Sequence, residues 1–206
     1  VRKEDGLIQL FNPPFDKSDL NPGYIKGYVP GVRENGGQYT HAAIWLAMAF
    51  AAIGNRKRTW DLLQMINPLN RGNNEEKIAI YKTEPYVIAA DIYAEPMHKG
   101  RGGWTWYTGS AGWMYQLIIE SFIGLKREAD ILKFTPCIPE EWKDLEINYR
   151  FENSNYHIQF IQTVSEIEKT MEVFLDEMVQ ENGIIPLIND GKAHEVKIEL
   201  FLFARL

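Results

Sequence analysis

Residues 100–115 read Gly-Arg-Gly-Gly-Trp-Thr-Trp-Tyr-Thr-Gly-Ser-Ala-Gly-Trp-Met-Tyr, and the rest of the chain is arranged around this stretch. It places five glycines among three tryptophans and two tyrosines. Glycine lets the backbone approach a ligand closely, and tryptophan and tyrosine offer flat apolar faces with a polar edge. Thr-Gly-Ser at 108–110 begins a predicted helix, whose free N–H groups and positive dipole end suit an anion such as phosphate. These residue types predict a carbohydrate site with an anion pocket; the alternative is an aromatic-lined turn that only fixes helix packing.

A second stretch, Arg-Glu-Asn-Gly-Gly-Gln-Tyr-Thr-His at 33–41, brings a guanidinium, a carboxylate and an imidazole into one glycine-bent loop. Arg33 offers a rigid fork of donors for a carboxylate or a phosphate, and Glu34 can accept hydrogen bonds from two sugar hydroxyls. His41 lies in the first turn of an apolar predicted helix and can donate to a phosphate oxygen. The alternative for His41 is a core histidine that a backbone carbonyl satisfies.

Composition narrows the classes of partner. The chain has 206 residues and a formal net charge of −6, which does not favour a nucleic acid or an anionic membrane surface. Cys137 is the single cysteine, so we expect no internal disulfide. The four histidines, His41, His98, His157 and His194, show no metal-ligand spacing, and we expect no metal.

The sequence shows no membrane span and no signal peptide. There is neither a run of about 18 apolar residues nor a charged-then-apolar start, so we expect no membrane span and no signal peptide. The prediction is a cytoplasmic protein, or the cytoplasmic face of a membrane enzyme. Because the chain starts abruptly at Val1, we expect it to be a piece of something longer.

Periodicity divides the chain near residue 130. Before it, apolar spacing and turn signals predict helices at 40–55, 56–66, 75–81, 85–93 and 109–125. After it, alternation predicts strands at 131–134, 145–151, 156–163, 170–175 and 195–203. Helical hairpins with long loops suit part of an α/α barrel or an α-solenoid, and short alternating strands indicate an antiparallel β-sandwich. We therefore expect domains at 1–129 and 130–206, with no site in the second.

Glu84 and Asp91 form a possible carboxylate pair for glycoside hydrolysis. They are seven residues apart on one face of the predicted 85–93 helix and its approach, so one could point into a cleft. Surface or buried ion pairs are the alternative use of such residues. If the protein were an inverting hydrolase, this pair would matter more than His41.

The stretches 33–41 and 100–113, with Glu84-Pro85-Tyr86 between them, resemble glycoside hydrolase family ninety-four. That family holds cellobiose and chitobiose phosphorylases and the carboxy-terminal part of cyclic β-1,2-glucan synthase. The Trp-Thr-Trp-Tyr sequence at 104–107 and the segment 185–194 look most like the synthase branch. The likeness covers nearly the whole chain, in order.

The resemblance implies a fold and a mechanism. The chain looks like the closing helices of an (α/α)6 barrel followed by the final β-sandwich. Family members are inverting phosphorylases, in which phosphate attacks the anomeric carbon while an aspartic acid protonates the leaving oxygen. The motifs of that general acid and of a phosphate-binding arginine belong to an earlier part of the barrel, so no catalytic residue is expected here. Without the acid, we expect this polypeptide alone to be inactive or nearly so.

The resemblance also implies which residues bind ligands. The phosphate site would use His41, Thr108 and Gly109, and the subsite for the cleaved glucosyl unit would use Arg33 and Glu34. Trp104 and Trp106 are the sugar-binding aromatics predicted from the glycine-rich stretch. No cofactor is implied beyond inorganic phosphate as co-substrate.

The function predicted is the carboxy-terminal fragment of an inverting glycoside phosphorylase or glycosyltransferase that acts on β-glucans. Its partners would be a β-glucan oligosaccharide, phosphate and the missing amino-terminal part of the enzyme. A non-catalytic carbohydrate-binding or accessory module and an inverting glycoside hydrolase are the alternatives. Half a barrel would leave apolar surface exposed, which predicts self-association.

Overall fold

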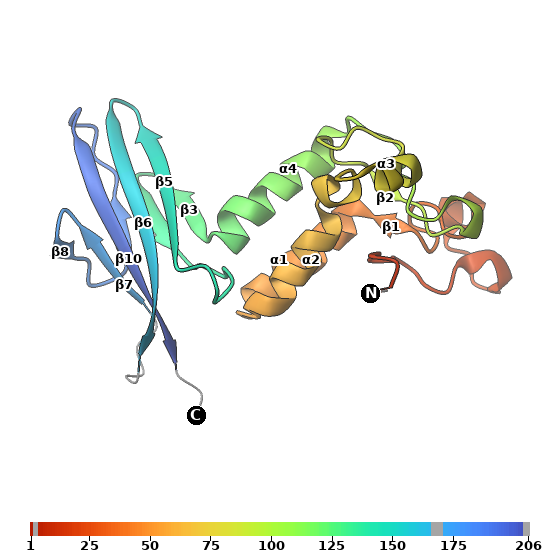
Figure 1. The fold of residues 1–206 in the computed structure, drawn as a ribbon, viewed down its shortest axis with the longest axis horizontal. Coiled ribbons are helices and arrows are strands. Elements are labelled where there is room, and N and C mark those ends of the chain that lie inside the picture. Colours follow the sequence, from red (N-terminus) through yellow and green to blue (C-terminus); the bar gives the residue numbers. More distant parts are fainter. Residues whose placement is uncertain (2–3, 166–170, 204–206) are drawn as a thin grey trace. The chain divides into compact units, whose positions relative to one another are not determined.

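The structure is a computed structural model that describes residues 1, 4–165 and 171–203. The chain divides into two compact units, Val1–Ile118 and Ile119–Leu206. Figure 1 shows helices and long loops in the first unit and strands in the second. The predicted domain limits at residue 130 stay a prediction, as does the (α/α)6 barrel. No helix among the described residues has both the length and the apolar character needed to cross a membrane.

The first unit alternates short helices with loops. Its elements are η1 (Phe15–Lys17), η2 (Gly23–Gly27), β1 (Gln38–Tyr39), α1 (Thr40–Ala52), α2 (Arg56–Ile66), η3 (Pro68–Arg71), α3 (Glu75–Tyr81), β2 (Asp91–Ile92), η4 (Pro96–His98) and α4 (Thr108–Gln116). Side-chain caps define two helix starts, because the amides of Asn55 and Asn74 accept hydrogen bonds from the backbone N–H groups of Arg58 and Lys77. The helices predicted at 40–55, 56–66 and 75–81 are therefore confirmed to within a few residues.

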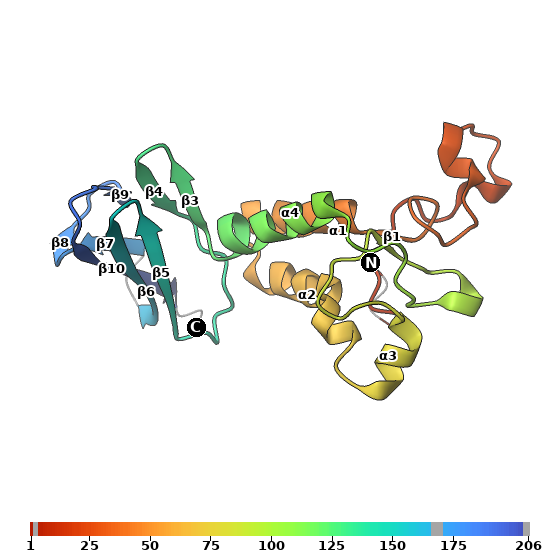
Figure 2. The ribbon, with the colours of Figure 1, turned by 90° about the horizontal axis from the view of Figure 1, so that it is seen from above.

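Helix α1 packs against both α2 and α4 (Figure 2). It buries Ala43, Ile44 and Ala47, whose small or branched side chains let the helices approach closely. The residues of α1 are apolar around its whole circumference, but other apolar side chains of this helix, such as Trp45, stay exposed in this chain.

The helix predicted at 85–93 is wrong. The backbone there pairs with neighbouring loops: Thr40 N–H donates to Ala90 O at 2.9 Å, and Ala90 N–H donates to Trp104 O at 2.7 Å. Strand β2 also pairs antiparallel with β1, with Tyr39 opposite Asp91. These long-range hydrogen bonds satisfy the backbone groups that a helix would have used internally, so tertiary pairing prevails over local helical pattern.

The helix predicted at 109–125 is shorter than expected. Helix α4 ends at Gln116 and continues as a π-helix, η5 (Leu117–Phe122). Gly124 then has a φ of +79°, and a Cβ atom there would lie 2.3 Å from the backbone of Thr135. Glycine therefore permits the close turn into the first strand of the second unit.

The second unit contains two sheets. Its strands are β3 (Leu125–Glu128), β4 (Ile131–Phe134), β5 (Asp144–Phe151), β6 (Ser154–Ser165), β7 (Met171–Leu175), β8 (Met178–Val179), β9 (Ile184–Pro186) and β10 (Ala193–Phe203). The larger sheet has the order β5-β6-β10-β7-β8 and the smaller one β3-β4-β9. Thr170, the first residue of one predicted strand, lies outside the described residues. The other predicted strands are confirmed, whereas β3, β8 and β9 were missed.

The larger sheet is mixed, not purely antiparallel as predicted. Strand β10 runs parallel to β6, with His194 opposite Tyr156 and Val196 opposite Ile158. A parallel pair needs a long crossover connection, and the segment that holds β7, β8 and β9 provides it. The alternation of side chains is as predicted: Ile158 and Phe160 are fully buried, and Phe160 meets Phe134 of the smaller sheet with ring centroids 5.9 Å apart.

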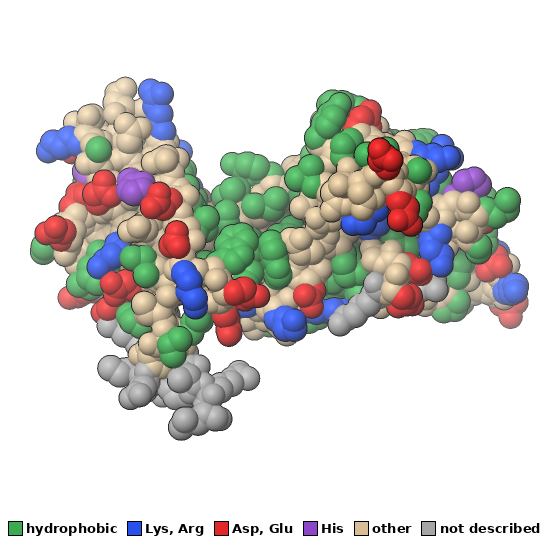
Figure 3. All heavy atoms as spheres, in the orientation of Figure 1, with side chains coloured by type: hydrophobic (Ala, Val, Ile, Leu, Met, Phe, Trp, Pro, Cys, Tyr) green, Lys and Arg blue, Asp and Glu red, His purple; other side chains and the backbone are tan. Residues whose placement is uncertain are grey.

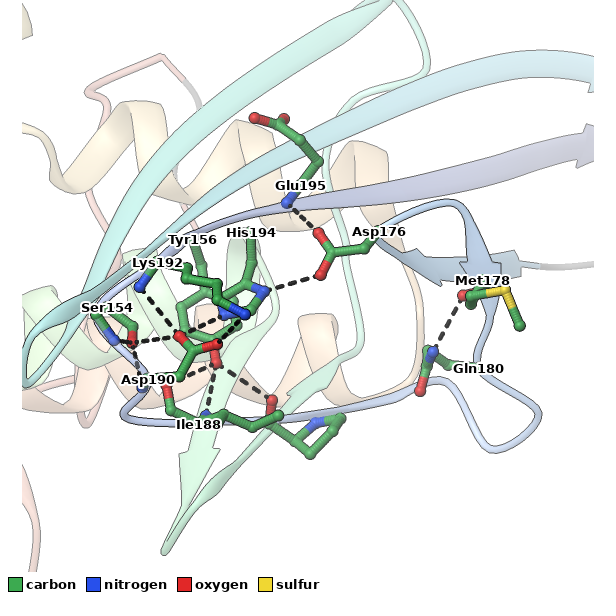
Figure 4. Close-up of polar contacts among 12 residues, drawn as sticks. Ser154, Tyr156, Asp176, Met178, Gln180, Ile188, Asp190, Lys192, His194 and Glu195 are labelled. Carbon is green, nitrogen blue, oxygen red and sulfur yellow. Dashed lines mark hydrogen bonds and ion pairs between the residues drawn. The ribbon is translucent and has the colours of Figure 1, made fainter.

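A polar cluster, in which His194 and Ser154 are buried and the carboxylates are exposed, joins the turns at one end of the larger sheet (Figure 4). His194 lies between two carboxylates, with Nδ1 2.8 Å from Asp176 Oδ2 and Nε2 3.2 Å from Asp190 Oδ1. Its ring stacks on Tyr156 at 4.8 Å between centroids. The hydroxyl of buried Ser154 contacts Asp190 and not the imidazole. Because both ring nitrogens are occupied, this set of serine, histidine and aspartate is arranged for packing and not for nucleophilic catalysis.

Candidate functional site

The glycine-rich loop presents two tryptophans to solvent before it enters α4. Trp104 and Trp106 are 61% and 67% exposed. Trp106 has a φ of +61°, which is unusual for a bulky residue, and its indole N–H donates to Glu84 Oε1 at 3.1 Å. The backbone N–H of Glu84 itself and then this indole lower the pKa of the Glu84 carboxyl. Glu84 thus fixes the orientation of one predicted sugar-binding aromatic.

Arg33 lies at the centre of three aromatic rings. Its guanidinium carbon is 5.1 Å from the ring centroid of Trp104, 5.5 Å from that of Tyr28 and 5.7 Å from that of Tyr39. Burial lowers the pKa of the guanidinium, but the neighbouring Tyr28 hydroxyl and Asp91 carboxylate raise it. The pKa of Arg33 therefore lies above its ordinary value. Cation–π contacts of this kind hold a charged side chain in a fixed position.

Glu34 is buried beside Arg33, and the two predicted sugar-binding residues face each other. Glu34 Oε2 lies 3.6 Å from Arg33 Nε, and Glu34 Oε1 accepts a hydrogen bond from the Tyr24 hydroxyl at 3.3 Å. Among the described residues, Glu34 Oε2 and Arg33 Nε make no hydrogen bond. The pair therefore keeps hydrogen-bonding capacity that a ligand could use after a small movement.

Asp91 connects the loop that holds Arg33 with the glycine-rich loop that holds Trp104. Its carboxylate is buried and accepts hydrogen bonds from the backbone N–H groups of Arg33, at 3.2 Å, and Trp104. Burial raises the pKa of this carboxyl, and the Arg33 N–H and charge oppose that rise. A Cβ atom on Gly103 would lie 2.0 Å from Asp91 Oδ1, so only glycine leaves room for the carboxylate there. Sequence reasoning placed Asp91 on a helix face and missed this role.

His41 and Gly109 meet at the start of α4. A Cβ atom added to Gly109 would lie 3.1 Å from Nε2 of His41, so the imidazole faces the backbone of the helix N-terminus. Thr108 is the first residue of α4, and the residue before it, Tyr107, provides no side-chain cap. The first N–H groups of the helix are thus left to another acceptor, and a helix N-terminus favours an anion.

Tyr39 connects the histidine with the arginine. Its ring stacks on His41 at 5.7 Å between centroids, and the guanidinium of Arg33 is 5.7 Å from the same ring. Trp45 packs edge-on against the His41 ring, with ring centroids 6.1 Å apart. Trp106 instead hydrogen-bonds to Glu84, and Thr108 begins α4. The other five predicted residues form two groups, His41 with Gly109 and Arg33 with Glu34 and Trp104, that share Tyr39. Sequence reasoning missed this role of Tyr39, although its position between Arg33 and His41 in one motif could have indicated it.

Among the described residues, no group of three or more histidine, cysteine, aspartate or glutamate side chains is placed to hold a metal ion. The site thus consists of a guanidinium in an aromatic cage, a buried carboxylate, a histidine and a helix N-terminus. Aromatic faces, a guanidinium and a carboxylate are groups with which carbohydrate-active proteins bind sugars, and a helix N-terminus favours an anion.

The chain belongs to the glycosyl hydrolase 94 superfamily, because the model of its catalytic domain matches residues 1–124. Over 158 residues, 77% of this chain, it is 45% identical to the cyclic beta-(1,2)-glucan synthase NdvB of Rhizobium meliloti (strain 1021). It is 25% identical over 191 residues, 92% of this chain, to a solabiose phosphorylase of Paenibacillus borealis. It is 31% identical over 142 residues, 62% of this chain, to a 1,2-beta-oligoglucan phosphorylase of Listeria innocua serovar 6a. These matches span 6%, 24% and 13% of the respective relatives. The predicted family is confirmed.

Proposed function

We propose that this chain is the carboxy-terminal part of an inverting glycoside phosphorylase or glycosyltransferase that acts on β-glucans. In this proposal it supplies phosphate and sugar contacts, while the general acid lies outside the chain. The observation that carries the proposal is the contact of His41 with Gly109 at the uncapped N-terminus of α4. The names of the relatives, which include β-glucan synthase and oligoglucan phosphorylase activities, support the substrate class.

The anion pocket would hold the phosphate that attacks the sugar. Free N–H groups in the first turn of α4 and the hydroxyl of Thr108 would donate hydrogen bonds to its oxygens, and His41 would donate a further one. Held in this way, phosphate oxygen forms a bond to the anomeric carbon as the glycosidic carbon–oxygen bond breaks. The leaving oxygen takes a proton from the acid outside the chain. Positioning of the nucleophile is therefore the contribution of these residues.

The sugar would lie over the arginine cage. Glu34 can accept hydrogen bonds from sugar hydroxyls, Arg33 can donate to them, and the exposed faces of Trp104 and Trp106 offer apolar surface for the ring. Asp91 does not suit the hydrolase alternative, because its carboxylate is buried and occupied by backbone N–H groups, and could not activate a water molecule.

Phosphate binding tests the proposal. In the protein as its organism makes it, His41→Ala should weaken inorganic phosphate binding on the order of tenfold, because one charge-assisted or neutral hydrogen bond is lost. Gly109→Ala should weaken it as well, since the new methyl group crowds the imidazole. Isothermal titration calorimetry with phosphate measures both effects.

Gly112→Ala is the matched control for Gly109→Ala. It lies in the same helix, and a Cβ atom there meets nothing within 4 Å, so phosphate affinity should be unchanged. If β-glucan oligosaccharide binds at Trp104 and Trp106 while phosphate binding is absent or insensitive to His41→Ala, the chain is a carbohydrate-binding module and the proposal fails.

A further inference from the structure

The first unit contains a cavity that the proposed site does not use. It has a volume of about 520 Å³ and is lined by the start of the described chain, the end of α2, η3, α3 and the residues before the glycine-rich loop. None of the predicted phosphate- or sugar-binding residues lines it. Its volume falls within the range of small-molecule sites, roughly 300–1,000 Å³.

The cavity carries more cations than carboxylates. Arg71, Lys77 and Lys99 line it together with Glu4 and Asp5. Lys99 Nζ lies 3.0 Å from Asp5 Oδ1, so these two charges offset each other. Lys77 Nζ donates to a backbone carbonyl at 2.9 Å and keeps two further N–H donors. The carbonyl that Lys77 contacts belongs to Asn70, the neighbour of Arg71, so Lys77 and Arg71 lie together on one wall.

Arg71 is the central cation of that wall. Its Nη2 donates to the carbonyls of Gly6 and, at 3.0 Å, Met65, which fixes the guanidinium against the cavity. Among the described residues Arg71 forms no ion pair, and its buried Nε has no hydrogen-bond acceptor. A largely desolvated guanidinium without a carboxylate favours an anionic ligand, and phosphate matches its planar set of donors.

The rest of the lining suits a sugar more than a bare ion. Ile80 and Tyr81 provide an apolar surface, and the carboxylates of Glu4 and Asp5 provide acceptors for hydroxyl groups. An inorganic phosphate ion would leave most of the volume unused. We propose that this cavity is a second ligand site that binds a monosaccharide phosphate, with the phosphate on Arg71 and Lys77 and the ring on Ile80.

Calorimetric titration of the protein as its organism makes it, with glucose 1-phosphate, inorganic phosphate and glucose as separate probes, tests this proposal. In a His41→Ala background, which weakens the proposed first phosphate site, glucose 1-phosphate should still bind. Arg71→Gln and Lys77→Gln should each weaken that binding on the order of tenfold, the loss expected for a charge-assisted hydrogen bond. Higher ionic strength should weaken it further.

Lys57→Gln is the control, because Lys57 is exposed on α2 and does not line the cavity. Inorganic phosphate and glucose should each bind at least about tenfold more weakly than glucose 1-phosphate if both halves of the ligand contribute.

Three outcomes would overturn the proposal: absence of glucose 1-phosphate binding in the His41→Ala background, affinity unaffected by the cavity variants, or inorganic phosphate that binds as tightly as the sugar phosphate. Arg71→Gln could unfold the protein, because the guanidinium also binds backbone carbonyls. In that case the affinity of Lys77→Gln for glucose 1-phosphate tests the proposal, since Lys77 is exposed. Failure of the first phosphate site alone, with cavity binding retained, counts against the proposed function and not against this site.

Discussion

At the scale of single residues, Asp91 and Gly103 are the pair on which the candidate site depends. The buried carboxylate accepts the N–H groups of Arg33 and Trp104, which come from loops far apart in sequence. Gly103 N–H also donates to the carbonyl of Asp91 at 2.8 Å. Because the carboxylate occupies the space where a Cβ atom of residue 103 would lie, the absence of a side chain there is a packing requirement and not a requirement for a special φ.

Gly103→Ala should therefore destabilise the first unit. The added methyl group would lie 2.7 Å from Asp91 Cγ, so the carboxylate must move and release at least one backbone donor. Crowding of this kind costs about 1–3 kcal/mol in free energy of unfolding. Urea unfolding followed by tryptophan fluorescence measures the change.

Gly112→Ala is again the control, and it should stabilise α4 by up to about 1 kcal/mol, because alanine is the better helix former and has open space there. Equal effects of the two substitutions would show that Asp91 does not fill the space beside Gly103.

The sequence alone identified most of the residues that meet at the site, but not what holds them. Arg33, Glu34 and His41 lie in one motif with strong chemical character, so residue type was informative. Asp91 and Tyr39 were missed in their roles because each acts through a contact between loops. Such contacts depend on the pairing of β1 with β2. Strands of two residues are too short to give a recognisable pattern in a sequence.

At the scale of elements, the polar cluster at His194 links three turns of the β-unit. Asp176 follows β7, and Asp190 precedes β10 and contacts Ser154 at the start of β6. His194 of β10 contacts both carboxylates and so holds these turns together. Local alternation predicted these strands, whereas the parallel pairing of β6 with β10 depends on how the crossover folds back. Alternation has the same period in parallel and antiparallel pairs, so it could not distinguish them.

The stability of the β-unit should depend on pH through His194. The hydrogen bond to Asp176 is the main factor that raises the pKa of His194 above its ordinary 6.5, while burial opposes it. Because the folded pKa is raised, this stabilisation is complete below pH 6.5 and is lost as pH rises through the folded pKa. The backbone N–H of Lys192 and the imidazole lower the pKa of Asp190 from 3.8 to about 2, so its contribution is lost as pH falls through that range.

His194→Gln should flatten the decline in stability above pH 6.5, measured by thermal unfolding between pH 5 and 9 in steps of about one unit. At pH 6 the variant should be less stable by up to about 1 kcal/mol, because His194 loses its hydrogen bonds to Asp176 and Asp190, which are exposed to solvent. His157→Gln is the control: His157 also pairs with carboxylates, but on the exposed face, where salt screens the interaction. An unchanged pH profile in His194→Gln would mean that the cluster does not govern acid–base stability.

At the scale of the whole molecule, the chain spans only 6–24% of the three relatives compared above. The (α/α)6 barrel stays a prediction, because a barrel is a property of a complete ring of helices. Family resemblance could predict that architecture, whereas periodicity could predict only separate amphipathic or apolar helices. The apolar character of α1 on all sides, with only one side buried here, is the feature that local patterns revealed most directly.

Several apolar side chains on α1 and α4 are exposed to solvent. Ile53 at the end of α1 and Tyr115 on α4 are 73% and 67% exposed, and Figure 3 shows hydrophobic side chains gathered over these two helices. Burying such surface stabilises an associated state by roughly 25 cal/mol for each Å² of apolar area removed from water. The 206-residue chain by itself should therefore self-associate with increasing concentration.

Sedimentation velocity over a concentration series measures that association. Ile53→Lys combined with Tyr115→Lys should shift the chain toward the monomer, because two charges would have to be desolvated in the associated state. Ile78→Lys is the matched control, since Ile78 is also about half exposed but lies on α3, away from α1 and α4. A wild-type chain that stays monomeric at all concentrations would show that the apolar face of α1 needs no covering. If Ile78→Lys reduced association equally, the association would be nonspecific, and α1 and α4 would not form the interface.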